Sequence, residues 1–173
     1  MKLNLYPCRK IASVYTLPYE KFWEQGIRGI LYDIDNTLVP DNAPADPHAV
    51  QLFQRLHEMG FRTCLVSNNK EPRVLPFAEA VHSEAVCRAH KPSANGYLEG
   101  IRRMGIRPDQ ALFIGDQIFT DIWGANRAGI RNFLTAPVDP HERVRIRLKR
   151  IPEKAVLFFY KFSHKSNSNK KNS

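Results

Sequence analysis

A short apolar segment that ends in two acidic residues constrains this chain more than any other feature. The segment Gly29–Tyr32 is rich in residues that favour β-strands, and Asp33 and Asp35 follow it with one residue between them. We predict a buried strand over residues 28–33. Ligands of open α/β sheets bind beyond the carboxyl ends of the strands, so we expect both acids to turn toward one point at that edge. A cation stabilises two carboxylates that lie so close together, and Mg²⁺ prefers oxygen ligands. A strand end with two solvated acids and an Asn-Thr turn fits the same residues, so the rest of the chain must decide.

Signals for helices and strands alternate along the remaining chain. The clearest helix follows Asp46, which suits the N-cap; Val50, Phe53 and Leu56 form its predicted apolar face, and Gly60 suits its end. The same reasoning predicts strands at 61–66, 83–87, 111–114 and 130–134, and helices at 71–80 (interrupted by Pro76), 93–104 and 120–128 (capped by Thr120). This alternation with short connections predicts an α/β fold, a Rossmann-like three-layer sandwich with a central parallel sheet.

Polar side chains follow four of the predicted strands. They are Asp33 and Asp35, Ser67 and Asn68, Lys91, and Asp116 with Asp121. The carboxyl ends of parallel strands meet at one edge of a sheet, so we expect these side chains to converge. Together they supply a nucleophilic carboxylate, a second acid, hydroxyl and amide donors, a cation and a metal-binding acid, which hydrolysis of a phosphate monoester requires. Each cluster alone also fits a turn, a surface lysine or a helix cap, but the four in this order favour a phosphatase.

Length and composition exclude several classes of protein. The 173 residues suffice for one domain with a hydrophobic core, and no apolar run is long enough to span a bilayer. The first residues lack the apolar core of a signal peptide. The three cysteines, Cys8, Cys64 and Cys87, form no Cys-x-x-Cys pair, so we expect reduced packing residues in a cytoplasmic protein.

The excess of positive charge lies almost entirely in the last part of the chain. Residues 1–140 hold 16 Lys and Arg against 15 Asp and Glu, whereas residues 141–173 hold 10 against 2. Basic residues at 143–150 precede apolar and aromatic residues at 156–162, a pattern that suits an anionic lipid surface or a nucleic acid, although a solvated tail that only aids solubility also fits. We expect peripheral contact with the inner face of the membrane through residues 141–162 and disorder over residues 163–173.

The residues before the first predicted strand carry a weaker signal. Between Pro18 and Gln25, the side chains of Tyr19, Phe22 and Trp23 recur at helical spacing. We expect them to cover an edge of the sheet or to pack on the body of the protein, with contact to lipid as the minor alternative. The role of residues 1–26 is otherwise left open.

The four polar clusters resemble the four signature motifs of the haloacid dehalogenase superfamily of phosphatases. The residues that carry the resemblance are Asp33–Thr37, Ser67, Lys91 and Gly115–Asp121. More narrowly, Gly29–Val39 and Gly115–Gly129 resemble the YqeG family, which includes phosphatidylglycerophosphate phosphatases of mitochondria. The resemblance covers residues 27–137 closely. We therefore expect a phosphatase domain of this kind over residues 1–140, with residues 27–137 as its core.

The resemblance implies a role for each matching residue. Asp33 would be the nucleophile that becomes an aspartyl phosphate, and Asp35 would protonate the leaving oxygen and then activate water. Ser67 would hydrogen-bond the phosphate, and Lys91 would offset the charge of nucleophile and phosphate. Mg²⁺ would be held by Asp33, the backbone carbonyl of Asp35, and Asp116. The supporting residues would be Thr37, which helps to hold the loop, Asn68 beside Ser67, and Asp121, which binds the ion through water or supports Lys91.

The spacing of the motifs leaves no room for the cap domain that many relatives insert between them. The site should therefore be open, and an open site suits a phosphate that a large partner presents. We expect phosphatidylglycerophosphate as the substrate. A phosphatase for a soluble phosphometabolite or for a nucleic acid end is the alternative enzyme. A non-catalytic protein that binds RNA or ribosomal particles is the alternative from another class. The oligomeric state does not follow from the sequence.

Overall fold

A six-stranded parallel sheet with helices on both faces forms the core of the protein. The computed structural model describes residues 4–139, and the predicted segments 141–162 and 163–173 lie outside the described residues. The strands are β1 (Arg9–Ile11), β2 (Gly29–Tyr32), β3 (Arg62–Val66), β4 (Glu84–Val86), β5 (Ala111–Gly115) and β6 (Arg131–Thr135). The α-helices are α1 (Tyr19–Glu24), α2 (Pro47–Glu58), α3 (Glu71–Ala80), α4 (Asn95–Met104) and α5 (Trp123–Arg127), joined by 3-10 turns at Val14–Thr16 and Pro108–Gln110 and by a π-helix at Ile118–Ile122.

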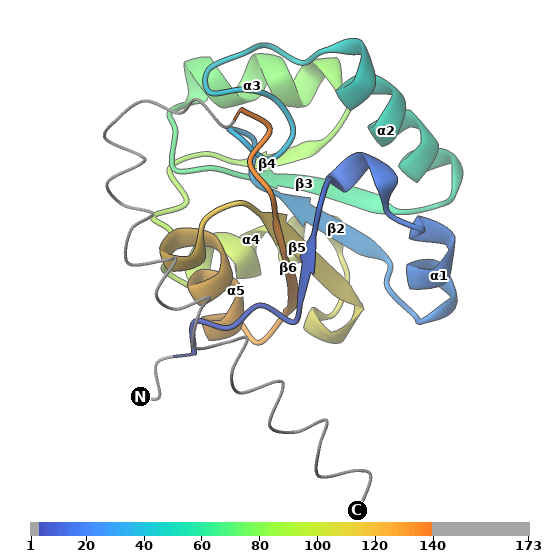
Figure 1. Ribbon diagram of the computed structural model, residues 1–173, viewed down its shortest axis with the longest axis vertical. Coiled ribbons are helices and arrows are strands. Elements are labelled where there is room, and N and C mark those ends of the chain that lie inside the picture. Colours follow the sequence, from blue (N-terminus) through green and yellow to red (C-terminus); the bar gives the residue numbers. More distant parts are fainter. Residues whose placement is uncertain (1–3, 140–173) are drawn as a thin grey trace, which may run out of the picture.

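The order of the strands brings the predicted motifs to one edge. The sheet runs β1-β6-β5-β2-β3-β4 with every pair parallel, so β2 lies between β5 and β3 (Figure 1). Tyr32 in β2 is opposite Leu65 in β3 and Ile114 in β5. The three strands therefore end at the same level, and the predicted α/β fold with a central parallel sheet is confirmed.

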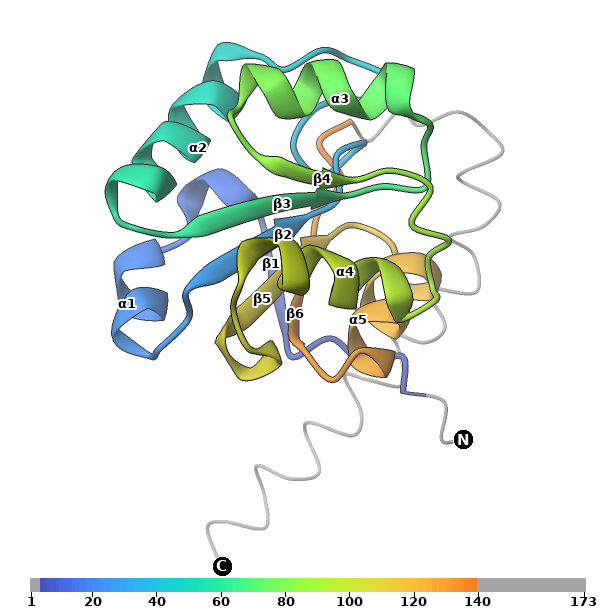
Figure 2. The same cartoon turned by 180° about the vertical axis from the view of Figure 1, so that it is seen from behind.

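Two hydrophobic clusters hold the three layers together. Alternate residues of a strand point to opposite faces, and in β2 Ile30 and Tyr32 pack with α1, α2 and α3, whereas Leu31 packs with α4 and α5. Figures 1 and 2 show these two groups of helices on opposite sides of the sheet. As expected, Tyr19 and Phe22 of α1 are buried in the body of the protein.

The structure corrects several predicted details. Val50 is 36% exposed, and the buried face of α2 is formed by Ala49, Leu52, Phe53 and Leu56. Pro76 does not interrupt α3, because burial of Val74, Phe77 and Ala78 outweighs the hydrogen bond that a proline removes. Thr120 does not cap a helix; the π-helix lies there and α5 begins only at Trp123. Strand β1, which was not predicted, has three residues and pairs with β6.

The cysteines are reduced as expected but are not all packing residues. All three cysteines are free, but Cys8 is exposed, so it does not pack as expected, whereas Cys64 is buried.

Within residues 4–139, the chain from β2 to β3 holds one helix and the chain from β3 to Lys91 holds one helix and one strand, which leaves no cap domain there. Among the described helices, none has the length and apolarity needed to cross a bilayer.

Candidate active site

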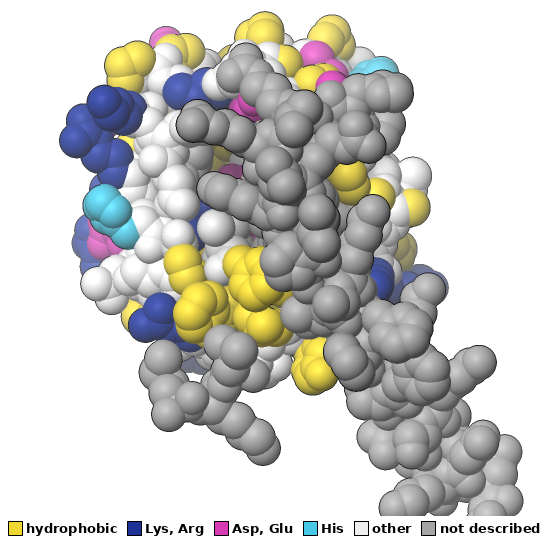
Figure 3. All heavy atoms as spheres, turned by 60° about the vertical axis from the view of Figure 1, so that its left-hand side comes forward, with side chains coloured by type: hydrophobic (Ala, Val, Ile, Leu, Met, Phe, Trp, Pro, Cys, Tyr) yellow, Lys and Arg dark blue, Asp and Glu magenta, His cyan; other side chains and the backbone are white. Residues whose placement is uncertain are grey.

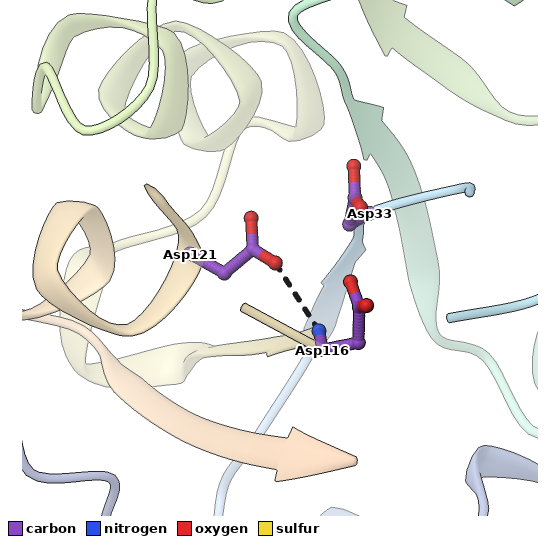
Figure 4. A group of neighbouring side chains, drawn as sticks. All are labelled: Asp33, Asp116 and Asp121. Atoms are coloured by element: carbon purple, nitrogen blue, oxygen red, sulfur yellow. Dashed lines mark hydrogen bonds between the residues drawn. The ribbon is translucent and has the colours of Figure 1, made fainter. Parts of the chain in front are cut away.

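Three buried acids meet beyond the carboxyl ends of β2 and β5. Asp33 follows β2, Asp116 follows β5, and Asp121 comes from the π-helix behind them. Each contributes a carboxylate oxygen to a group whose members lie within 4.8 Å of one another. Figure 4 shows the carboxylates of all three residues converging from these elements. The expected convergence of Asp33 and Asp116 is therefore present.

Lys91 lies against two of these acids. Its Nζ donates hydrogen bonds to Asp33 Oδ1 at 2.6 Å and to Asp121 Oδ1 at 2.7 Å, and its side chain is only 4% exposed. Asn68 fixes the backbone of the same residue: Lys91 N donates to Asn68 Oδ1 at 2.6 Å, and Asn68 Nδ2 donates to the carbonyl of Lys91 at 3.2 Å. Asn68 thus anchors the backbone of the lysine through its side-chain oxygen and one of the two N–H groups of its amide.

Asp121 has a partner at each carboxylate oxygen. Oδ1 accepts from Lys91, and Oδ2 accepts from the backbone N–H groups of Asp116 at 3.1 Å and Gln117 at 3.0 Å. A Cβ at Gly115 would lie 2.5 Å from Asp121 Oδ2, so only glycine allows this close approach. The Tyr97 hydroxyl donates to the carbonyl of Thr120 at 2.9 Å and steadies the π-helix. Asp121 is therefore placed to position Lys91 and the Asp116 loop rather than to hold an ion directly.

The site is short of positive charge. Three buried carboxylates lie around one ammonium among the described residues. The pKa of Asp33 is raised to about 7, because burial disfavours the charged carboxylate; the adjacent Lys91 opposes this shift and the charge of Asp121 adds to it. Burial disfavours the Lys91 ammonium, but Asp121 and Asp33 outweigh that cost and raise the pKa of Lys91 above its ordinary value. The lysine is thus charged at neutral pH, and the carboxylates can accommodate a further cation.

The donors present suit a hard divalent cation. Asp33 and Asp116 supply buried carboxylate oxygens from neighbouring strand ends, and the Thr37 hydroxyl is 3.4 Å from Asp116 Oδ1. Oxygen donors of this kind, without histidine or thiolate, fit Mg²⁺ better than zinc or copper. The buried acids can therefore hold a metal ion.

Asp35 is oriented differently from the other acids. Its Oδ1 accepts from Arg73 Nη2 at 2.8 Å and from the backbone N–H of Asn42 at 2.9 Å, and its Oδ2 accepts from Asn69 Nδ2 at 2.7 Å. Its carboxylate is not in the three-acid group, although its charge still raises the pKa of Asp33. We expected Asp33 and Asp35 to turn toward one point. Only Asp33 faces the group of buried acids, whereas Asp35 turns to Arg73 and Asn69. Sequence reasoning missed Arg73 and Asn69, whose only signal was their position just after Ser67.

Ser67 occupies the end of β3 beside the acids. The residue is 2% exposed, and its Oγ accepts from the backbone N–H of Asn69 at 3.1 Å. A hydroxyl can accept and donate at once, so the O–H of Ser67 remains able to donate to an anion.

Comparison with known proteins identifies the family. A model of the haloacid dehalogenase-like hydrolases matches residues 38–129, and the chain belongs to this family. Within it, the chain belongs to the YqeG proteins: "Probable phosphatase YqeG" from Bacillus subtilis strain 168 is 32% identical over 158 residues, which are 91% of this chain and 92% of that protein. A glyceraldehyde 3-phosphate phosphatase from Methanopyrus kandleri is 32% identical over 94 residues, 49% of this chain and 40% of that enzyme.

Solved structures agree on the fold. An HAD phosphatase from Thermococcus onnurineus superposes with a TM-score of 0.51 at 14% identity, covering 68% of this chain and 89% of that one. An HAD-superfamily hydrolase from Ehrlichia chaffeensis gives 0.52 at 16% identity, covering 62% and 89%. The family and the phosphatases among its relatives support phosphatase activity for this chain.

Proposed function

We propose that this protein is an Mg²⁺-dependent phosphatase that works through an aspartyl phosphate and acts on phosphatidylglycerophosphate. The observation that carries the catalytic part is the contact of the Lys91 ammonium with the Asp33 carboxylate, inside a group of three buried acids. A dianionic phosphate can approach such a carboxylate only where cations offset the repulsion. Lys91 supplies one cation, and Mg²⁺ bound by Asp33, the backbone carbonyl of Asp35 and Asp116 would supply the charge that is still missing.

The reaction proceeds in two displacements. An oxygen of Asp33 attacks phosphorus, the bond to the leaving oxygen breaks, and Asp35 gives its proton to that oxygen. Water then attacks the phosphorus of the aspartyl phosphate while Asp35 takes a proton from the water. Inorganic phosphate is released, and the carboxylate of Asp33 is restored. The Ser67 O–H donates to a phosphate oxygen, and Lys91 stabilises the charge that builds up in each step.

Three observations support a lipid substrate. The chain belongs to the YqeG proteins, and the described residues hold no cap that would enclose a small metabolite. Residues 141–173 carry 10 Lys and Arg against 2 Asp and Glu, next to aromatic residues that suit an anionic bilayer surface. Figure 3 shows one face of the molecule, on which hydrophobic side chains gather in the lower part and Lys and Arg side chains lie at both edges.

A soluble phosphometabolite is the second candidate substrate. The similarity to the glyceraldehyde 3-phosphate phosphatase of M. kandleri favours it, although the match spans less than half of either protein. The third candidate substrate is a nucleic acid end, which the basic residues beyond position 140 favour.

The catalytic proposal is tested by turnover of the full chain with Mg²⁺. Asp33→Asn should lower kcat by about a thousandfold or more, as expected for loss of a nucleophile. The matched control is Asp109→Asn, because that exposed acid pairs with Arg107 just before β5, at the opposite end of the strand from Asp116. Activity that Asp33→Asn leaves unchanged would refute the mechanism and indicate a contaminating phosphatase, which would favour a non-catalytic protein that binds RNA.

The substrate proposal needs a separate panel. Phosphatidylglycerophosphate in vesicles should be hydrolysed in preference to sugar phosphates, glyceraldehyde 3-phosphate and 5′-phosphorylated oligonucleotides. A preference for any of the soluble compounds would remove the lipid assignment. Sedimentation with anionic vesicles, with and without residues 141–173, tests the membrane contact, and equal binding of both chains would contradict it.

A further inference from the structure

Arg73 holds the residue to which the proposed mechanism assigns proton transfer. The arginine is in the first turn of α3, and its Nη2 lies 2.8 Å from Asp35 Oδ1. Both side chains are largely buried, at 18% and 16% exposure, so this ion pair is not one of the loose surface contacts found elsewhere on the described chain. Arg73 differs in its burial and in its place at the edge of the site from Arg88, which pairs with Glu71 and is 57% exposed.

The carboxylate of Asp35 is occupied at both oxygens. Oδ1 accepts from Arg73 and from the backbone N–H of Asn42, and Oδ2 accepts from the side-chain amide of Asn69. All three partners are donors, and an ionised carboxylate only accepts. The arrangement therefore holds the carboxylate of Asp35 and the guanidinium of Arg73 together at the edge of the site.

Arg73 has donor capacity that the described residues do not use. Its Nε is buried and has no hydrogen-bond partner. The described residues contain only one other such atom, Oδ1 of Asn36, the neighbour of Asp35 in the chain. Folded proteins leave few buried polar atoms unpaired, and each one calls for an explanation such as a bound group. A guanidinium with a free Nε next to the leaving-group acid is suited to a planar pair of anionic oxygens.

We propose that Arg73 recognises a second anion on the substrate, a phosphodiester on the leaving-group side of the scissile phosphate. The guanidinium offers its unpaired Nε and an Nη to the two non-bridging oxygens of that diester. Because Asp35 lies 2.8 Å from the same guanidinium, the diester is bound next to the residue that transfers the proton. This inference rests on the proposed function and deepens it, because it selects substrates in which a glycerol leaving group also carries a phosphodiester.

The test compares two soluble substrates with the same kind of leaving oxygen. Deacylated phosphatidylglycerophosphate carries the phosphodiester, whereas glycerol 3-phosphate lacks it, and neither requires a bilayer. The readout is the ratio of their kcat/KM values with the full chain and Mg²⁺. For the wild-type chain the ratio should favour the diester. In Arg73→Gln the ratio should fall roughly 10- to 100-fold, the effect of losing hydrogen bonds to a charged group.

Two further variants keep the test sharp. Arg88→Gln removes the cation of an exposed ion pair just after β4. It should leave the ratio of the two kcat/KM values unchanged. Arg73→Lys keeps the charge but loses the fork, so its ratio should also fall, and it replaces Arg73→Gln as the test if that variant does not fold. A mere structural role for Arg73 would lower both kcat/KM values in parallel.

The outcomes separate this inference from the proposed function. Wild-type turnover of both substrates, with a ratio that neither Arg73 variant changes, would overturn the role of Arg73 and leave the phosphatase intact. Failure of the wild-type chain to hydrolyse any phosphate monoester would overturn the proposed function and this inference with it. A fall in the ratio in the Arg73 variants but not in Arg88→Gln supports the inference.

Discussion

The buried carboxylate of Asp121 offers the most direct test of how the site is held together. It is fully buried and accepts from the ammonium of Lys91 and from the backbone N–H groups of Asp116 and Gln117. Asp121→Asn keeps the shape of the side chain but replaces one acceptor oxygen with an NH₂ donor. Whichever way the amide is turned, a donor then faces either the ammonium or the two backbone N–H groups.

The expected loss can be worked from the distances. At an effective dielectric constant of about 20, the attraction between Asp121 and Lys91 at 2.7 Å is about 6 kcal/mol. The same substitution removes repulsion between Asp121 and the other two acids, Asp33 and Asp116, which is about 3 kcal/mol for each pair of oxygens within 4.8 Å. One unsatisfied buried donor adds about 1–3 kcal/mol. The net loss in free energy of unfolding is then about 1–3 kcal/mol.

Urea unfolding at neutral pH with EDTA measures this loss without a contribution from bound metal. With a slope of about 2 kcal/mol/M, the midpoint should fall by about 0.5–1.5 M. Asp109→Asn is the matched control, since the same chemical change there affects a pair whose side chains are 69% and 68% exposed, and its midpoint should equal that of the unaltered protein. Equal midpoints for Asp121→Asn and Asp109→Asn would refute the reasoning that Asp121 anchors the site.

Three further predictions follow from burial and charge. Burial raises the pKa of Cys64 to about 12, so little thiolate forms at pH 8; a thiol reagent should modify exposed Cys8 in the folded protein and reach Cys64 only after unfolding restores its ordinary pKa, and equal rates in the folded state would contradict this. Gly115→Ala should lower stability by about 1–3 kcal/mol, because the new methyl group would meet the fixed carboxylate of Asp121; an unchanged urea midpoint would show that the loop can yield. Chelation should abolish phosphatase activity reversibly, and Mg²⁺ should raise the melting temperature, since an ion bound only by the folded state stabilises it; full activity in EDTA would exclude the metal.

Much of the fold followed from local patterns in the sequence. The strands at the centre of the sheet are short apolar runs bounded by turn residues, and the predicted positions of β2, β3 and β5 agree with the structure to within a few residues. Patterns failed where local signals were weak or where packing overruled them. Strand β1 has only three residues, two of them exposed, and the helix that contains Pro76 is held by the burial of its neighbours.

The candidate site divides in the same way. Asp33, Ser67 and Asp116 could be placed beforehand because each directly follows its own strand, and parallel strands end at a common edge. The partners of Asp35 could not be placed. Arg73 is 38 residues away in the chain, and its contact depends on the angle at which α3 leaves the end of β3.

The sequence by itself determined which chemical groups arrive at the functional edge, because strand periodicity and turn residues act over only a few neighbouring positions. Only the tertiary structure decided which group faces which. The sheet order places β2 between β5 and β3, and this lets Lys91 reach both Asp33 and Asp121 while Asp35 turns to Arg73. Such pairings depend on the packing of segments that are distant in the chain, and no local pattern encodes them.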